Sequence, residues 1–347
     1  MKRGRLLQPT FAYESWGTLN ASADNAVLLF TGLSPSAHAS SSTDDPSAGW
    51  WEDMIGPAKP IDTNNYFVIC VNSLGSCFGS TGPASINPAT GSAYRLSFPV
   101  LTVEDIANTA THILNDLGID TLNTVVGASM GGMTALAFAQ QHPERTRRLL
   151  SISSAARSLP LSIALRSLQR EMIRTDPTWE NGEYDLGGHG PVNGMRLARK
   201  LGMITYRSGV EWAERFGRER TSSFAQSDNP FSIDFEVEGY LESHANRFVG
   251  SFDPNCYLYL SRAMDLYDAA DQGGSLDASF ANLKIKTALI IGVETDFLFP
   301  VGQQEELALA LDQHVEQVTF KRMASIQGHD SFLVDMDRFR PAIAEFF

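Results

Sequence analysis

The chain has 347 residues, a hydrophobic content of 43% and a charged content of 19%, the composition of an ordinary globular protein. Its formal net charge of −13 opposes bulk attraction to nucleic acid or to an anionic membrane surface. An anionic ligand would therefore have to bind at a local basic patch. No segment approaches the roughly 20 continuous apolar residues that a transmembrane helix requires.

The cysteine and histidine patterns argue against a metal site. The three cysteines, Cys70, Cys77 and Cys256, are odd in number and lack metal-ligand spacing. The seven histidines include no HxH or HExxH motif. The amino-terminal segment has no apolar run long enough for a signal peptide. These features predict a reduced, cytoplasmic protein without a metal site.

Apolar runs alternate with helical patterns along most of the chain. The patterns predict strands within residues 25–33, 65–76, 121–127, 148–157, 286–300 and 315–325. They predict helices within residues 103–119, 132–146 and 302–313. Strands of continuous Val, Ile and Leu that alternate with helices are typical of a parallel sheet covered on both faces. The predicted fold class is therefore α/β.

Residues 158–282 interrupt this alternation. They are largely helical, contain Gly/Asp-rich breaks such as residues 180–194, and include no clear buried strand. We predict that residues 158–282 form a helical lid inserted into an α/β core, which residues 1–157 and 283–347 build.

One short motif predicts a catalytic serine. Gly127-Ala128-Ser129-Met130-Gly131 fits the pattern G-x-S-x-G, with a predicted strand before it and a predicted helix after it. In that context the pattern is typical of a nucleophile elbow, in which a strained turn exposes the serine oxygen at the carboxyl edge of the sheet. The alternative is a simple strand-to-helix turn with an incidental serine.

A serine hydroxyl needs a base to become a good nucleophile. Elbow folds supply the partners in the chain order Ser, Asp or Glu, His. Asp296 follows one predicted strand and His329 follows the next, so we predict that His329 takes the proton and Asp296 orients its ring. Glu294 is a nearby competitor for the carboxylate role. Asp296 as a helix cap and His329 as a surface histidine are the alternatives without catalysis.

An oxyanion hole requires two backbone N–H groups. The residue after the nucleophile, Met130, supplies one donor. The loop after the first long strand supplies the other, and we predict Leu33 for that role, with Gly32 allowing close approach of the backbone.

Longer motifs resemble the homoserine O-acetyltransferase family of α/β hydrolases. They include GWWEDMIGPAKPIDTNNYFVICVN, LGSCFGSTGPASINPATGSAYRLSFP, GASMGGMTALAFAQQHPERTRRLLSISSAAR, LARKLGMITYRS, DPNCYLYLSRAMDLYD and GHDSFLVD. The resemblance covers nearly the whole chain. It implies an α/β-hydrolase fold with a lid, and a ping-pong transfer from acyl-CoA through Ser129 to an amino acid hydroxyl. It also implies a homodimer without a permanently bound cofactor, with acyl-CoA as co-substrate.

The resemblance also implies residues that bind the acceptor. Arg199 and Asp330 match the substrate-binding positions of the family. A guanidinium suits the carboxylate of an amino acid, and a carboxylate suits its ammonium group. A surface charge on the lid and a loop cap are the respective alternatives for these two residues.

Departures from the family pattern suggest which acceptor and donor are used. The loop Gly32-Leu33-Ser34-Pro35 and the segment NSLGSCFGSTGPASINPATG are more similar to the serine O-succinyltransferase and serine O-acetyltransferase branch. A shorter pocket would favour serine, which has one methylene fewer than homoserine. Arg166 and Arg170 share one helix face, and we predict that Arg166 pairs with the free carboxylate of a succinyl donor. The same arginines could instead bind coenzyme A phosphates or remain solvated.

The sequence therefore predicts an L-serine O-acyltransferase that acts on small molecules, with succinyl favoured and acetyl possible. Acylation of homoserine is the main alternative. An esterase of the same fold is a more distant one, and a non-catalytic binding protein is an alternative from another class.

Overall fold

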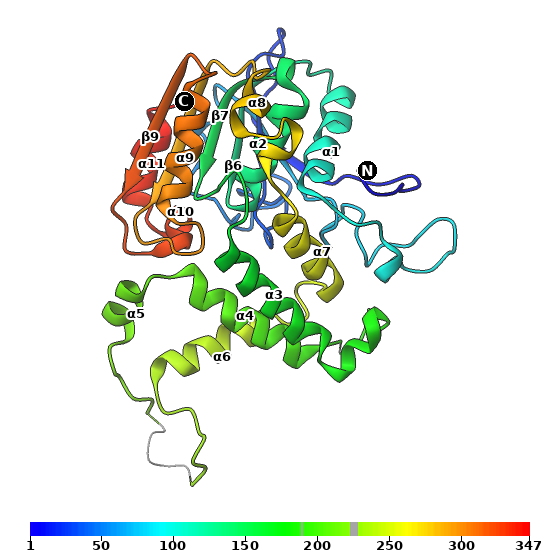
Figure 1. The fold of residues 1–347 in the computed structure, drawn as a ribbon, viewed down its shortest axis with the longest axis vertical. Helices are drawn as coiled ribbons and strands as arrows, with labels where there is room; N and C mark the ends of the chain where they lie inside the picture. Colours follow the sequence, from blue (N-terminus) through cyan, green and yellow to red (C-terminus); the bar gives the residue numbers. More distant parts are fainter. Residues whose placement is uncertain (189, 223–227) are drawn as a thin grey trace.

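The computed structural model describes residues 1–188, 190–222 and 228–347. A seven-stranded sheet of order β1-β5-β2-β6-β7-β8-β9 lies at its centre (Figure 1). The strands are β1 (Tyr13–Trp16), β2 (Ala26–Phe30), β5 (Phe67–Val71), β6 (Leu122–Ala128), β7 (Thr146–Ile152), β8 (Thr287–Val293) and β9 (Gln317–Met323). β1 is antiparallel to β5, and all the other pairs are parallel. The predicted α/β fold class is confirmed.

Helices cover both faces of the sheet, which explains why its inner strands β2 and β5 are apolar at every position. Along β2, Leu28 faces a core cluster shared with Leu136 of α2, whereas Leu29 faces a second cluster with Trp51 and Phe339. Successive side chains of a strand point to opposite faces, so a sheet buried on both sides needs apolar residues at every position. The covering helices are α1 (Val103–Asp116), α2 (Met130–Gln141), α9 (Val301–Asp312), α10 (Ser331–Val334) and α11 (Met336–Ala344).

Each predicted strand and helix of the core corresponds to an observed one. α1 begins at a capping box between Thr102 and Asp105 and ends just before Gly118, whose φ is +69°. The sequence patterns predict neither β1 nor the small sheet of β3 (Ile55–Gly56) and β4 (Ile61–Asp62). These strands have only four, two and two residues, too few to produce a periodic signal.

The segment between β7 and β8 is helical over the residues that the structure describes. It contains α3 (Pro160–Arg174), α4 (Val192–Tyr206), α5 (Gly209–Phe216), α6 (Glu236–Phe248), α7 (Pro254–Asp265) and α8 (Leu276–Phe280). Figure 1 shows α3 to α6 together beyond one edge of the sheet, with α7 between them and the core. α8 lies beside the sheet, and its Phe280 shares a buried cluster with Leu307 of α9. The lid boundaries at 158 and 282 stay a prediction.

Short 3₁₀ helices complete the described structure. They span Arg95–Ser97, Pro143–Arg145, Pro177–Gly182, Ala269–Gln272 and Gly328–Asp330. Within residues 1–188, 190–222 and 228–347, no helix has both the length and the apolar character needed to cross a membrane.

Candidate active site

Ser129 lies in a strained turn between β6 and α2. Its backbone has φ +56° and ψ −124°, a region that costs a non-glycine residue about 1–3 kcal/mol. Two hydrogen bonds hold the turn: the Ser129 N–H donates to the Ile152 carbonyl at 2.9 Å, and Ser154 Oγ donates to the Ser129 carbonyl at 2.7 Å. The structure thus places Ser129 at the carboxyl edge of the sheet, as the motif predicts.

The glycines around Ser129 allow the chain to turn this tightly. A Cβ on Gly127 would lie 2.0 Å from the Gly131 carbonyl oxygen, and one on Gly131 would lie 2.2 Å from the Phe30 carbonyl oxygen. A Cβ on Gly132 would lie 2.4 Å from Ser154 Cβ. Any larger residue at these positions would push α2 away from the ends of β2 and β7.

The structure brings Ser129, His329 and Asp296 together from three loops. Ser129 Oγ lies 2.8 Å from His329 Nε2, and His329 Nδ1 lies 2.7 Å from Asp296 Oδ2. The other Asp296 oxygen accepts the backbone N–H groups of Leu298 at 3.0 Å and Phe299 at 2.9 Å. Because Asp296 is held at both oxygens, the carboxylate is fixed in the orientation that receives the imidazole N–H.

The environment of His329 favours its charged form. Burial of the ring acts to lower the pKa of His329, but the charge of Asp296 and the hydrogen bond that its carboxylate accepts outweigh this effect, so the pKa is raised. Phe299 stacks on the ring with centroids 5.2 Å apart. An imidazole that is oriented by a carboxylate and faces a serine hydroxyl can accept and return a proton.

The competitor Glu294 does not reach the histidine. Its carboxylate points to the surface, where Arg322 Nε lies 3.7 Å away, and about half of the side chain is exposed. Strand geometry explains the difference, because Glu294 directly follows β8 and Asp296 lies two residues further, in the loop that turns over His329.

The predicted oxyanion loop lies against the start of α2. Gly32, Leu33, Ser34 and Pro35 follow β2 and are all partly exposed, whereas Met130 is fully buried at the first turn of α2. The close approach of Gly131 to the end of β2 joins this loop to the elbow. This arrangement keeps the two predicted donors on neighbouring segments, and their roles remain a prediction.

Charged residues from α4, from Arg207 directly after it and from the loop after β9 lie near His329. Asp330 Oδ2 lies 3.4 Å from Arg207 Nε, and the pKa of Asp330 is raised, mainly by loss of hydration. Arg199 lies on α4 with its guanidinium 4.4 Å from the centre of the Phe248 ring. The Arg199 Nε atom is buried and has no hydrogen-bond partner in the described structure. A half-buried guanidinium whose buried Nε donor is unused is suited to an anionic ligand.

Arg166 and Arg170 share one buried counter-ion, Asp265 of α7. Arg166 Nε and Arg170 Nη2 each lie 2.6 Å from an oxygen of that carboxylate, which is 1% exposed. Arg166 Nη2 also donates to Ser158 Oγ at 2.6 Å. The Arg166 Nη1 group is buried without a partner in the described residues, whereas Arg170 Nη1 donates to Ser261 Oγ at 2.9 Å. Arg166 is therefore the member of the pair with a donor left for a ligand.

Asp265 and Tyr206 belong to this site as well, although no sequence motif marked them. Tyr206 lies two turns after Arg199 on α4, and its ring centre is 6.1 Å from that of His329. Burial raises the pKa of Tyr206, so its hydroxyl stays protonated. The seven-residue spacing places Tyr206 and Arg199 on one helix face and is the signal that could have found it. Asp265 could have been sought as the charge that two buried arginines require.

Among the residues that the structure describes, no group of His, Cys, Asp and Glu side chains is arranged to hold a metal ion. The site instead resembles those of enzymes that act through a serine nucleophile. A family model for the alpha/beta hydrolase fold matches residues 25–334. The chain belongs to the α/β hydrolase fold family.

Two relatives in this family match over almost their full length. Serine O-succinyltransferase from Litchfieldella anticariensis is 57% identical over 344 residues, covering 99% of this chain and 94% of that protein. Serine O-succinyltransferase from Xylella fastidiosa (strain M12) is 55% identical over 348 residues, covering 100% and 94%. The resemblance to this branch, expected from the sequence, is confirmed.

Solved α/β hydrolases of two activities share the fold. Homoserine O-acetyltransferase from Bacillus anthracis superposes with a TM-score of 0.89 at 29% identity, covering 97% of this chain and 91% of that one. Esterase E22 superposes with a TM-score of 0.86 at 30% identity, covering 97% and 94%. The fold accommodates both transfer and hydrolysis, so the activity has to be argued from the site.

Proposed function

We propose that this protein is an L-serine O-succinyltransferase that works through a covalent succinyl-enzyme on Ser129. The observation that carries the proposal is the hydrogen-bonded series Ser129–His329–Asp296 next to the two charged residues Arg199 and Asp330. The identity of 55–57% to curated serine O-succinyltransferases over the full chain supports the reaction type and the substrates.

In the first half-reaction, Ser129 Oγ attacks the thioester carbon of succinyl-CoA while His329 Nε2 takes its proton. The N–H groups of Met130 and Leu33 stabilise the carbonyl oxygen as it becomes an oxyanion. The carbon–sulfur bond then breaks, and His329 returns the proton to the sulfur as coenzyme A leaves. Asp296 stabilises the imidazolium that forms between these two steps.

In the second half-reaction, the hydroxyl of L-serine attacks the carbonyl carbon of the succinyl ester on Ser129. Its proton passes to His329, the Ser129 ester breaks, and the proton returns to Ser129 Oγ. Arg199 binds the carboxylate of the acceptor and Asp330 binds its ammonium. Such a pair favours an amino acid over water because it holds the attacking hydroxyl in place.

Arg166 supplies the contact that distinguishes succinyl from acetyl. It is fixed by Asp265 and Ser158, and its buried Nη1 group has no partner within the described part of the chain. A succinyl carboxylate would satisfy this donor, and an acetyl methyl group would leave it unsatisfied. Arg170 has both terminal nitrogens engaged and serves mainly to hold Asp265.

The loop Gly32–Pro35 sets the length of the acceptor pocket in this proposal. L-Homoserine is the alternative acceptor, which the likeness to homoserine O-acetyltransferase from B. anthracis favours. One methylene changes binding in an apolar pocket by roughly 1–3 kcal/mol, so some activity with both acceptors is expected.

The proposal includes a lid over residues 158–282 and a homodimer. Apolar side chains on the outer surfaces of α3 and α4 are exposed, namely Leu161, Leu168, Leu197 and Ile204. Two copies that pack these surfaces together would bury them. We place the reaction in the cytoplasm, with acyl-CoA as co-substrate and no permanently bound cofactor.

The experiment that tests the proposal measures thiol release from succinyl-CoA and acetyl-CoA, each with L-serine, L-homoserine or water alone. We expect release that requires L-serine and is faster with succinyl-CoA. Intact mass measurement without acceptor should show one succinyl group on the wild-type chain and none on Ser129→Ala. Rapid release with water alone would identify an esterase, and preference for L-homoserine would identify the alternative transferase.

A further inference from the structure

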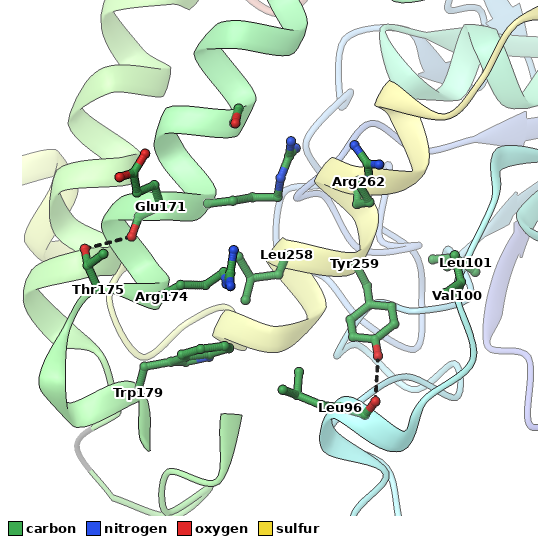
Figure 2. A pocket seen from close by; sticks show the side chains of 12 residues that line it. Leu96, Val100, Leu101, Glu171, Arg174, Thr175, Trp179, Leu258, Tyr259 and Arg262 are labelled. Carbon is green, nitrogen blue, oxygen red and sulfur yellow. Dashed lines mark hydrogen bonds between the residues drawn. The ribbon is translucent and has the colours of Figure 1, made fainter. Parts of the chain in front are cut away.

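A cavity of about 750 Å³ opens between α3, α7 and the segment around residues 96–101 (Figure 2). It is separate from the catalytic serine, since no residue of the Ser129–His329–Asp296 series lines it. The side chains drawn in Figure 2 come from three parts of the chain that are far apart in sequence. The folded protein therefore creates this cavity, and no local motif predicts it.

The cavity is positively charged although the protein is acidic. Arg170, Arg174 and Arg262 line it, and Glu171 is the one carboxylate among its described lining residues. Arg170 is paired with Asp265, but the exposed guanidiniums of Arg174 and Arg262 make no ion pair within the described structure. Two unpaired guanidiniums in one cavity are suited to phosphate, which accepts the planar N–H fork.

One wall of the cavity is aromatic and held in place by hydrogen bonds. Trp179 Nε1 donates to Asn255 Oδ1 of α7 at 3.0 Å, and the Arg174 guanidinium lies 5.8 Å from the Trp179 ring centre. Tyr259 OH donates to the Phe98 carbonyl at 2.8 Å (Figure 2 shows its second bond, to Leu96). A fixed aromatic wall next to guanidiniums suits a heteroaromatic base that carries phosphates.

α3 links this cavity to the active site. Near its start, Ser162 Oγ donates to the Leu298 carbonyl at 2.5 Å, within the loop that holds Asp296. Arg166, Arg170 and Arg174 follow at intervals of four residues along one side of the helix. The rise of an α-helix places Arg174 about 18 Å beyond Ser162. In extended acyl-CoA, the pantetheine arm separates the thioester from the nucleotide phosphates by a distance of similar size.

We propose that the cavity binds the phosphorylated nucleotide end of acyl-CoA, with Arg174 and Arg262 on its phosphates and Trp179 beside its adenine. This rests on the proposed function, because that function makes acyl-CoA the donor. The thioester then reaches Ser129 along α3, and Arg166 meets the acyl carboxylate. Glu171 faces the same cavity and limits its positive charge.

The test uses the double variant Arg174→Ala/Arg262→Ala and two donors, succinyl-CoA and succinyl-pantetheine, which has no nucleotide or phosphate. We expect the KM for succinyl-CoA to rise at least tenfold, with the KM values for succinyl-pantetheine and L-serine unchanged. Arg322→Ala is the matched control, because Arg322 is half exposed on β9, away from the cavity. Equal changes for both donors would overturn the proposal.

A binding measurement separates failure of this proposal from failure of the proposed function. Calorimetry with adenosine 3′,5′-bisphosphate, which carries no acyl group, should give binding to the wild type and to Arg322→Ala that the double variant loses. Adenosine monophosphate should bind more weakly. If no donor acylates Ser129 but this binding pattern holds, the activity is wrong and the nucleotide site stands. Unchanged bisphosphate binding in the double variant would refute the site, even in an active succinyltransferase.

Discussion

His329 Nδ1 lies 2.7 Å from Asp296 Oδ2, and this buried pair sets the protonation of the ring that faces Ser129. Burial alone would lower the pKa of His329, but the charge of Asp296 and the hydrogen bond that its carboxylate accepts raise the pKa above its ordinary value. The ring acts as a base only when it is neutral. The rate of acyl-enzyme formation should therefore fall as the pH decreases through this raised pKa.

Replacing Asp296 with Asn should lower the pKa of His329 instead of raising it. The charge that raises the pKa is removed and the burial that lowers it remains, so the acid limb should move to lower pH. The maximal rate should drop by about 10⁴-fold, because an amide does not stabilise the imidazolium. A pH profile of pre-steady-state thiol release measures both effects. Glu294→Gln is the control and should keep the wild-type profile; an unshifted limb in Asp296→Asn would contradict the assignment.

The shared counter-ion of Arg166 and Arg170 should dominate the stability of the contact between α3 and α7. Asp265 is 1% exposed, and Asp265→Asn would leave two buried guanidiniums with a neutral partner. Loss of one partner from a buried ion pair costs about 3–5 kcal/mol. Urea unfolding of the variant should show a decrease of that size in the free energy of unfolding.

The surface offers a matched control for this effect. Glu242 of α6 also bridges two cations, Arg196 and Lys200 of α4, but its side chain is 28% exposed. Glu242→Gln should cost only about 0–1 kcal/mol, since water replaces the lost contacts. Equal losses in Asp265→Asn and Glu242→Gln would show that burial does not govern the first pair.

Much of the core could be predicted because each of its signals is local. Runs such as Ala26–Phe30 and Phe67–Val71 are apolar at every position, and Gly127, Ser129 and Gly131 mark the turn between β6 and α2. β1 could not be predicted, since Tyr13–Trp16 pairs at an edge and buries only Trp16. Its pairing with β5 depends on the folded sheet.

The order of Asp296 and His329 in the sequence was enough to nominate them, because chain order in an elbow fold restricts the choice. The pairing of Asp265 with Arg166 spans 99 residues and joins α7 to α3, so no spacing rule reaches it. The cavity beside Arg174 and Arg262 could not be predicted from the sequence either, because α3 and α7 meet only in the folded chain.

Arg199 should act in the second half-reaction and not in the first. Its Nε group has no hydrogen-bond partner among the residues that the structure describes and is proposed to bind the carboxylate of L-serine. A hydrogen bond to a charged group contributes about 1.5–3 kcal/mol. Arg199→Gln should therefore raise the KM for L-serine by roughly 10–100-fold. The rate of succinyl-enzyme formation without acceptor should stay at the wild-type value. Steady-state kinetics and intact mass measurement together separate the two half-reactions.

Arg196, three residues earlier on α4, gives the control for Arg199. It pairs with Glu242 at the surface at 2.9 Å, and Arg196→Gln should leave the KM for L-serine unchanged. If Arg199→Gln instead slows succinyl-enzyme formation, Arg199 acts on the donor and its assignment to the acceptor is wrong.

Arg166 should determine the preference between donors. Its buried Nη1 group gains a partner from a succinyl carboxylate and none from an acetyl methyl group. Arg166→Gln should lower kcat/KM for succinyl-CoA by roughly 10–100-fold more than for acetyl-CoA, the effect of one charge-assisted contact. Since the substitution also disturbs Asp265, the informative quantity is the ratio of kcat/KM for the two donors, measured in one preparation.

Arg170→Gln is the control, because it disturbs the same carboxylate. It should lower the activity with both donors to the same extent and leave the ratio unchanged. A ratio that shifts equally in the two variants would mean that Asp265, and not the free nitrogen of Arg166, selects the donor.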